Sequence, residues 1–118
     1  MTRTDPHVSQ FQRDVGQAME ALRMGFQSEV VLAEGYSVDL AMVERRIAIE
    51  VDGPWHFVSP DRRSGWEPTG STVLKRRQLQ ALGWEVVSIP FYEWPHGEMA
   101  RKEYLELVLL GQGVDIRS

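Results

Sequence analysis

The segment 47-IAIEVD-52 is the feature that most constrains the fold. Its apolar residues are small or β-branched, as is typical of a buried β-strand. Because side chains alternate between the two faces of a strand, Glu50 and Asp52 lie on the same face. Two neighbouring carboxylates repel each other, and their burial is costly unless a partner compensates it. The segment therefore predicts a buried strand, and it raises the question of what compensates the two acids.

A second strand precedes this one at a very short distance. In residues 36–44, Val38, Leu40 and Met42 share one face and Asp39 lies on the other. The short charged turn 44-ERR-46 then predicts an antiparallel hairpin. Asp39 and the acidic pair should therefore occupy neighbouring strands.

The remaining segments predict an α/β domain with a mixed sheet flanked by helices. Ser9 and Gln12 resemble a capping box, and Gly25 is the expected C-cap of this first helix. The expected elements are a helix over 9–24, strands over 28–35, 36–44 and 47–52, a long loop over 53–71, a helix over 72–82, a strand over 84–91 and a helix over 98–110. The order is α-β-β-β-α-β-α, and the last strand should run parallel to its partner after a right-handed crossover.

The three acids suggest a metal site. Asp39, Glu50 and Asp52 would offer the oxygen ligands that Mg²⁺ or Mn²⁺ prefers, and a bound cation could activate water beside a phosphate. The alternative is that Glu50 and Asp52 face solvent at the sheet end or pair with arginines.

Two further residues are candidates for the same chemistry. Lys75 shares a helical stripe with Leu79 and Leu82, so it can snorkel to water or reach over the sheet toward the acids, whereas Arg76 should point elsewhere. His56 follows the acidic pair in the loop, where a histidine can serve as general base, metal ligand or phosphate donor. A lone histidine more often has none of these roles.

Charge and composition restrict the partners. The net charge of -4 disfavours nucleic acid, but five basic residues gather in one region, which is either a phosphate-binding surface or an ordinary solvated one: Arg62, Arg63, Lys75, Arg76 and Arg77. The absence of cysteine excludes disulfides and zinc–thiolate sites. No apolar run is long enough for a membrane span, and the segment MTRTDPHVSQFQRD does not look like a targeting peptide.

Aromatic residues around the long loop have two readings. Trp55, Phe57 and Trp66, together with Arg62 and Arg63, could form stacking platforms for unpaired bases or could pack the loop onto the core. The aromatic residues bordering the last strand are expected in the core: Trp84, Phe91, Tyr92 and Trp94.

The start of the 72–82 helix is a second candidate RNA contact. Ser71 or Thr72 is the expected N-cap, and the free N–H groups of the first turn could hold a phosphate. Plain N-capping explains the same residues without a ligand.

Taken together, these motifs strongly resemble the RAP domain, named as an RNA-binding domain abundant in apicomplexans. The resemblance runs from about Tyr36 to Leu105 and rests on 36-YSVDLAMVERRIAIEVDGPWHF-57, 69-TGSTVLKRRQLQALGWEVVSIPFYEW-94 and 101-RKEYL-105. With the expected elements, it gives residues 1–30 as an N-terminal helix and start of the core, 31–110 as the RAP domain and 111–118 as a flexible tail.

The resemblance also implies a fold and a role. RAP domains look like the very-short-patch-repair branch of the PD-(D/E)xK nucleases, which implies a restriction-endonuclease-like core. Asp39 and Glu50 match the two acids of that motif, and His56 matches a histidine of the repair branch. Asp52 stands where lysine is usual, and Lys75 would supply that charge from the helix.

Three functions remain in competition. The leading one is RNA binding, with single-stranded RNA favoured, in RNA processing in mitochondria or chloroplasts, next to upstream helical repeats in a longer protein. The second is a Mg²⁺- or Mn²⁺-dependent endoribonuclease using Asp39, Glu50, Asp52, His56 and Lys75. The third is a catalytically inactive protein-interaction module.

Overall fold

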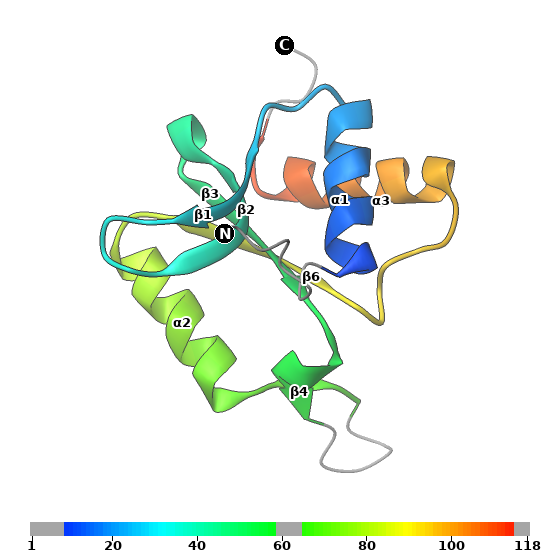
Figure 1. The fold of residues 1–118 in the computed structure, drawn as a ribbon. Helices are drawn as coiled ribbons and strands as arrows, with labels where there is room; N and C mark the ends of the chain where they lie inside the picture. Colours follow the sequence, from blue (N-terminus) through cyan, green and yellow to red (C-terminus); the bar gives the residue numbers. More distant parts are fainter. Residues whose placement is uncertain (1–8, 59–64, 115–118) are drawn as a thin grey trace, which may run out of the picture.

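A four-stranded mixed sheet forms the centre of the molecule in the computed structural model, which describes residues 9–58 and 65–114. The strand order is β1-β2-β3-β6 (Figure 1). The neighbours β1/β2 and β2/β3 are antiparallel, and β3/β6 are parallel. The strands are β1 (Gln27–Val31), β2 (Ser37–Met42), β3 (Ile47–Asp52) and β6 (Glu85–Pro90). The predicted mixed sheet and the α-β-β-β-α-β-α order are confirmed.

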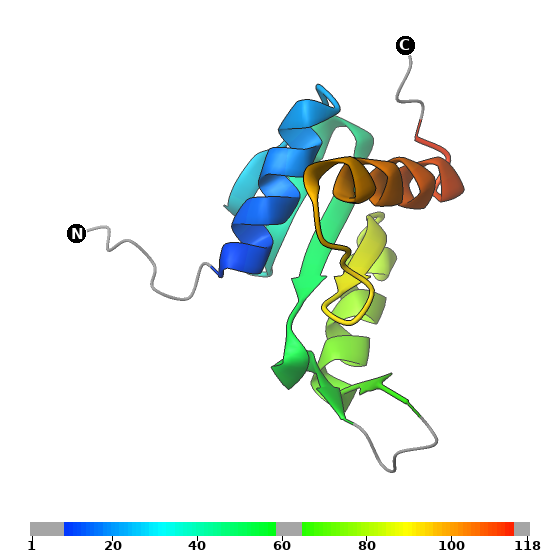
Figure 2. The same cartoon turned by 90° about the vertical axis from the view of Figure 1, so that its right-hand side faces the viewer.

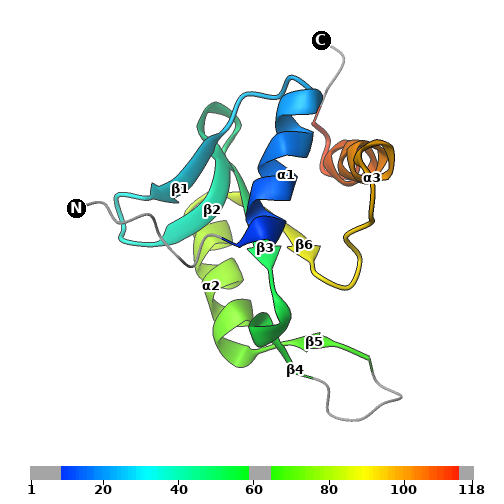
Figure 3. The same cartoon turned by 45° about the vertical axis from the view of Figure 1, so that its right-hand side comes forward.

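Three helices cover the sheet. The helices α1 (Gln10–Ala21) and α3 (Glu98–Gly111) lie on one face, and α2 (Gly70–Ala81) lies on the other (Figure 3). The helix α2 connects β3 to the parallel strand β6, as expected for a crossover unit. Within the described ranges, no helix is long and apolar enough to cross a membrane.

The hairpin of β2 and β3 fixes which side chains face which helix. Its register pairs Leu40 with Ile49 and Ala41 with Ala48. Leu40 and Ile49 pack on the α1/α3 side, while Ala41 and Ala48 pack on the α2 side. The connecting turn is a short 3-10 helix, η1 (Val43–Arg45). This confirms the predicted hairpin and the shared face of Leu40 and Met42, whereas Val38, expected on that face, packs with the cluster on the α2 side.

The segment predicted as a long loop contains three short elements. They are the 3-10 helix η2 (Pro54–His56) and the two-residue strands β4 (Phe57–Val58) and β5 (Glu67–Pro68), which pair antiparallel. This small hairpin projects beyond the end of the main sheet, beneath the start of α2 (Figure 2). The helix α2 begins at Gly70, two residues earlier than the predicted 72.

The end of α1 differs from the prediction. Ser9 is the N-cap, as expected, and accepts a hydrogen bond from the Gln12 backbone. The helix ends at Ala21 rather than at 24, and Gly25 is not its cap. Arg23 takes a left-handed conformation with φ 58, so that the backbone N–H of Met24 bonds back to the Met19 carbonyl. Met24 is buried in the core, and its packing explains why the helix stops early.

The two chain ends belong to the same compact core. Helix α1 packs against α3 and β3, so the N-terminal segment is part of the domain. Val114, inside the predicted flexible tail, is buried and donates its backbone N–H to Leu109. The packed fold therefore extends at least to Val114, and residues 115–118 lie outside the described part.

Candidate functional site

The end of β3 places two carboxylates beneath α2. Glu50 and Asp52 are only 5% and 2% exposed. Both point to the α2 face, because Ile49 and Val51, which alternate with them along β3, face α1 and α3. The predicted arrangement on one strand face is confirmed, and the burial means that each acid requires a partner.

Asp52 is held by three donors. Its Oδ1 lies 2.8 Å from His56 Nδ1. Its Oδ2 accepts hydrogen bonds from Arg76 Nη2 at 2.9 Å and from Ser88 Oγ at 2.5 Å. Arg76 Nη2 also donates to Ser88 Oγ at 2.9 Å. Since a carboxylate can only accept, the His56 contact places the proton on Nδ1 and directs Nε2 away from Asp52.

The position of Arg76 corrects the expectation that it points away from the sheet. Arg76 follows Lys75 and precedes Leu79 by three residues, so all three occupy one side of α2. Leu79 is fully buried, which turns that side toward the sheet and brings Arg76 onto Asp52. Arg77, the next residue, is exposed.

Glu50 interacts with a lysine from α2 and with an aspartate from β2. Lys75 Nζ lies 2.7 Å from Glu50 Oε1, so Lys75 does reach over the sheet. Burial, followed by the neighbouring charge of Asp39, raises the pKa of Glu50 to about 7, although Lys75 opposes the shift. Glu50 is therefore near its midpoint of protonation at neutral pH, whereas a free glutamate would be ionised.

Asp39 joins the site from β2. Its Oδ2 accepts a hydrogen bond of 2.7 Å from the backbone N–H of Val51, so the side chain bridges β2 and β3 beyond their last backbone pair. Asp39 and Glu50 are cross-strand neighbours, which explains why the Asp39 charge acts on the pKa of Glu50. The structure thus brings Asp39 and Glu50 together, while Asp52 forms an ion pair with Arg76.

Metal binding stays a prediction. In residues 9–58 and 65–114, no three histidine, aspartate or glutamate side chains are grouped as ligands of one ion. Asp39 and Glu50 alone offer oxygens to a common cation, and Mg²⁺ is commonly bound through one or two carboxylates with substrate phosphates completing its shell. Asp39 and Glu50 would be the ligands of such a cation, which would compete with Lys75 for Glu50, whereas Asp52 is already satisfied by Arg76, Ser88 and His56.

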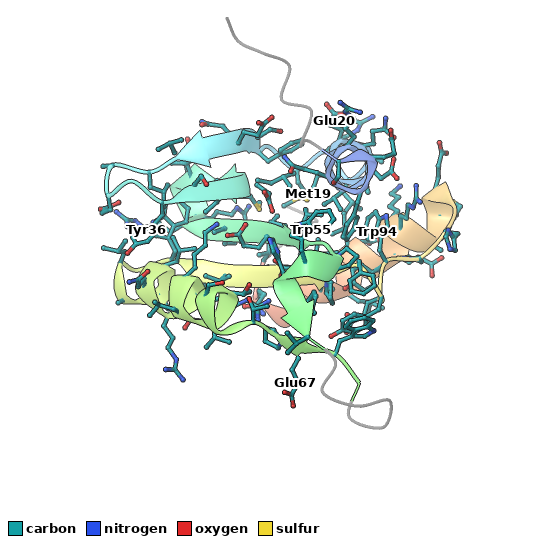
Figure 4. All side chains as sticks on the ribbon, turned by 60° about the horizontal axis from the view of Figure 1, so that its bottom comes forward. Met19, Glu20, Tyr36, Trp55, Glu67 and Trp94 are labelled. Carbon is teal, nitrogen blue, oxygen red and sulfur yellow. The ribbon has the colours of Figure 1, made fainter. Side chains whose placement is uncertain are left out.

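Trp55 and His56 form the exposed rim of the site. Trp55 is 71% exposed and lies beside the end of β3 (Figure 4). A Cβ on Gly53 would lie 3.0 Å from the Trp55 ring, so the indole packs directly on the glycine backbone. The His56 side chain is 37% exposed and meets the Trp55 ring edge-on. An aromatic and a titratable side chain are thus presented together.

The other loop aromatics divide into buried and exposed rings. Phe57 is buried, so for this residue the packing interpretation holds. Trp66 packs on Phe91 with ring centroids 5.1 Å apart, yet it remains 43% exposed. Tyr92, predicted in the core, is 47% exposed and stacks on Trp66. The prediction for Tyr92 is wrong because the chain leaves β6 at Pro90, where the sheet ends.

The other two aromatics of this group are largely covered. Trp84 is buried against α2, as predicted. Trp94 is half-buried beside α1 and α3 (Figure 4), where it packs on Phe11 and Tyr104. These two rings contribute to the core and not to the site.

The start of α2 is tied to the rim. Thr69, rather than Ser71 or Thr72, is the N-cap, and its Oγ1 accepts from the Thr72 backbone at 3.3 Å. The Thr69 backbone N–H donates to the His56 carbonyl at 2.8 Å. Ser71 is exposed on the first turn. The helix start and His56 therefore form one unit.

Two predicted RNA contacts lie outside the described residues. These are Arg62 and Arg63, in the segment 59–64.

A cavity of about 560 Å³ elsewhere on the molecule contains no predicted site residue. Its lining runs over 22–27 and 41–45. It adjoins the η1 turn, away from the ends of the strands that carry the acids.

Sequence reasoning missed one member of the site. Ser88 lies opposite Glu50 in the parallel register of β3 and β6 and bonds Asp52. Its polarity between the apolar residues Val87 and Ile89 was the available signal. The parallel register, which the sequence does not reveal, was needed to use it.

The fold has a counterpart among nucleases. The catalytic domain of the homing endonuclease I-Bth0305I superposes with a TM-score of 0.56 and 16% sequence identity, covering 88% of this chain and 91% of that one. The sheet and its helices are therefore restriction-endonuclease-like, as predicted. At this identity the likeness concerns the fold alone.

The sequence then assigns the family. Residues 49–107, half of the chain, match the sequence profile of the RAP domain. The chain belongs to the RAP domain family.

Curated relatives agree with that assignment. The "RAP domain-containing protein, chloroplastic" of Oryza sativa subsp. japonica is 37% identical over 103 residues, covering 86% of this chain and 15% of the relative. The "FAST kinase domain-containing protein 3, mitochondrial" of Homo sapiens is 36% identical over 72 residues, covering 59% of this chain and 10% of the relative. The chain thus spans only a small part of the relatives it matches.

Proposed function

We propose that this RAP domain binds RNA during RNA processing in a mitochondrion or chloroplast. Membership of the RAP family and the chloroplastic and mitochondrial names of the relatives support this role. Because those relatives are much longer, the domain would act beside other RNA-binding segments of a longer protein, such as helical repeats.

The pairing of acids with cations on α2 carries the proposal. Three carboxylates would repel a phosphate backbone. Lys75 neutralises Glu50, and Arg76 neutralises Asp52 from the same helix. With two of the three charges compensated, phosphates can approach the exposed first turn of α2, His56 and Arg77.

A salt titration of RNA binding tests this role. A labelled single-stranded RNA should bind the domain, with an affinity that falls as salt rises. Arg77→Ala should lower the slope of log affinity against log salt by about 1, because one phosphate contact is lost. Arg45→Ala, an exposed arginine on η1, is the matched control and should leave the slope unchanged.

Two results would contradict the proposal. Absence of RNA binding at low salt would favour the protein-interaction module. Equal slopes for wild type and Arg77→Ala would remove Arg77 from the RNA-binding surface.

A metal-dependent endoribonuclease is the second candidate, favoured by the grouping of Asp39, Glu50 and Lys75. Two acids with a nearby lysine could hold Mg²⁺ or Mn²⁺ and a scissile phosphate, with the cation supplying Lewis-acid chemistry. In this role Lys75 would neutralise the phosphate, and His56 Nε2, fixed through Asp52, would accept a proton.

A cleavage assay separates the two candidates. Labelled RNA would be incubated with Mn²⁺, with Mg²⁺ or with a chelator, beside Glu50→Gln. Cleavage that requires metal and Glu50 supports the enzyme. Intact RNA in every lane, together with measured binding, supports the binding role alone.

A further inference from the structure

Four aromatic rings gather at the foot of the β4–β5 hairpin, and we call them the aromatic ledge: Phe57, Trp66, Phe91 and Tyr92. The two phenylalanine rings lie 5.8 Å apart and support the others. Tyr92 meets Phe57 edge-on at 5.4 Å, and Trp66 meets Phe91 edge-on at 5.1 Å. The four rings of the ledge therefore contact one another and form one packed cluster.

The outer pair of the ledge exposes flat aromatic surface. Trp66 and Tyr92 are nearly parallel, with an interplanar angle of 17° and centroids 6.4 Å apart. Both remain 43–47% exposed, although Phe57 beneath them is almost fully buried. The outer pair therefore leaves flat apolar area accessible to a ligand, while Phe57 is covered.

The ledge is continuous with the proposed RNA-binding surface. Phe57 follows His56 directly in the chain and pairs with Pro68, which precedes the N-cap of α2. Phe91 donates its backbone N–H to the Asp52 carbonyl at 2.9 Å. A strand whose phosphates lie at His56 and the first turn of α2 would therefore have its bases within the same structural unit as the ledge.

We infer that the outer pair, Trp66 and Tyr92, stacks an unpaired RNA base. This inference rests on the proposed RNA binding and specifies its substrate class as single-stranded. Parallel flat rings match the shape of a nucleobase, and stacking of this kind tolerates any base because each base has a π-face. A duplex hides its base faces, so it cannot use the ledge.

The first test compares RNA substrates and a matched pair of variants. Wild type should bind a short single-stranded RNA more tightly than the corresponding duplex, and abasic sites should weaken binding. Tyr92→Leu should reduce the affinity for the intact strand about 10-fold, in line with the loss of one stacked base. Tyr36→Leu, a half-buried tyrosine beside the β1–β2 turn and far from Trp55 in Figure 4, should leave affinity unchanged.

The second test uses tryptophan fluorescence. Stacking of a base on Trp66 should quench part of the emission when RNA is added. Trp66→Phe retains an aromatic ring, so it should keep most of the affinity while losing that part of the quenching. Trp94→Phe, in the half-buried cluster beside α1 and α3, should keep the quenching.

The outcomes separate this inference from the proposed function. No binding of any RNA by wild type overturns both. Binding that is equal for intact and abasic strands, and equal for Tyr92→Leu and wild type, retains RNA binding and overturns the ledge. A change in oligomeric state in Tyr92→Leu without a change in RNA affinity would assign the ledge to protein contacts instead.

Discussion

The two faces of the sheet are built from different chemistry. The α1/α3 face holds a continuous apolar core, with Val15, Met19, Ile49, Leu105 and Leu109 all fully buried. The α2 face has a smaller apolar core at one end, around Leu79 and Trp84, and buried charges at the other. Both faces exclude water, but only one of them does so with apolar side chains alone.

This difference separates stability from function. Burial of apolar area supplies most of the free energy of folding, and the α1/α3 face supplies most of that area. Buried ion pairs contribute little net stability, because the desolvation of both charges offsets their attraction. Burial of the charged side chains on the α2 face therefore costs desolvation free energy, and the apolar burial on the α1/α3 face offsets it.

The largest expected effect comes from the apolar face. Leu105→Ala removes a fully buried side chain and leaves a cavity, so the free energy of unfolding should fall by about 3 kcal/mol. Denaturant unfolding followed by circular dichroism measures the change. Leu107→Ala, on the same helix but 72% exposed, should change stability by less than about 0.5 kcal/mol. Similar losses for both variants would contradict the assignment of the α1/α3 face as the main core.

The second prediction concerns Glu50, whose raised pKa links stability to pH. The pKa is about 7 in the folded protein and 4.5 in the reference state, so the folded state binds more protons between these values. Stability should therefore decline as the pH rises from 4.5 to 7. Glu50→Gln removes this dependence and should gain up to about 3 kcal/mol relative to wild type across that window.

Denaturant unfolding of both proteins at several pH values tests this prediction by measuring the free energy of unfolding. The difference between Glu50→Gln and wild type should grow with pH and level off above about 7. Glu93→Gln is a control, since Glu93 is exposed and lies on the surface near α3. A constant difference between Glu50→Gln and wild type over the whole range would show that Glu50 has an ordinary pKa in the folded protein.

The sequence was sufficient for the elements with strong local signals. Alternation in 36–52 predicts the hairpin and the faces of its paired residues, though not that of Val38, and the acidic pair on β3 marks the place of the charged site. The Ser9 N-cap could also be predicted, because capping depends only on residues close in the sequence.

The partners within the site depended on tertiary geometry. Arg76 reaches Asp52 because Leu79 turns one side of α2 toward the sheet, and Ser88 joins them through the parallel β3–β6 register. Tyr92 is expected in the core because it borders the last strand, but the strand ends at Pro90, before it. Neither the rotation of a weakly amphipathic helix nor the path of a chain after a strand is encoded in local periodicity.

The smallest expected effect separates two adjacent arginines on α2. Arg76→Ala leaves Asp52 buried without its cation, and loss of one partner of a buried pair costs several kcal/mol. Arg76 is partly exposed, and Ser88 and His56 still donate to Asp52, so the expected loss of stability is about 2 kcal/mol.

The neighbouring Arg77 provides the matched control for both stability and binding. It is exposed, so Arg77→Ala should change stability by less than about 0.5 kcal/mol while it weakens RNA binding. Adding Asp52→Ala to Arg76→Ala should cost less than the sum of the single changes, because no unpaired charge remains. Equal stability of Arg76→Ala and Arg77→Ala would mean that Arg76 behaves as a surface residue. Strict additivity of Arg76→Ala and Asp52→Ala would mean that the two side chains do not stabilise each other.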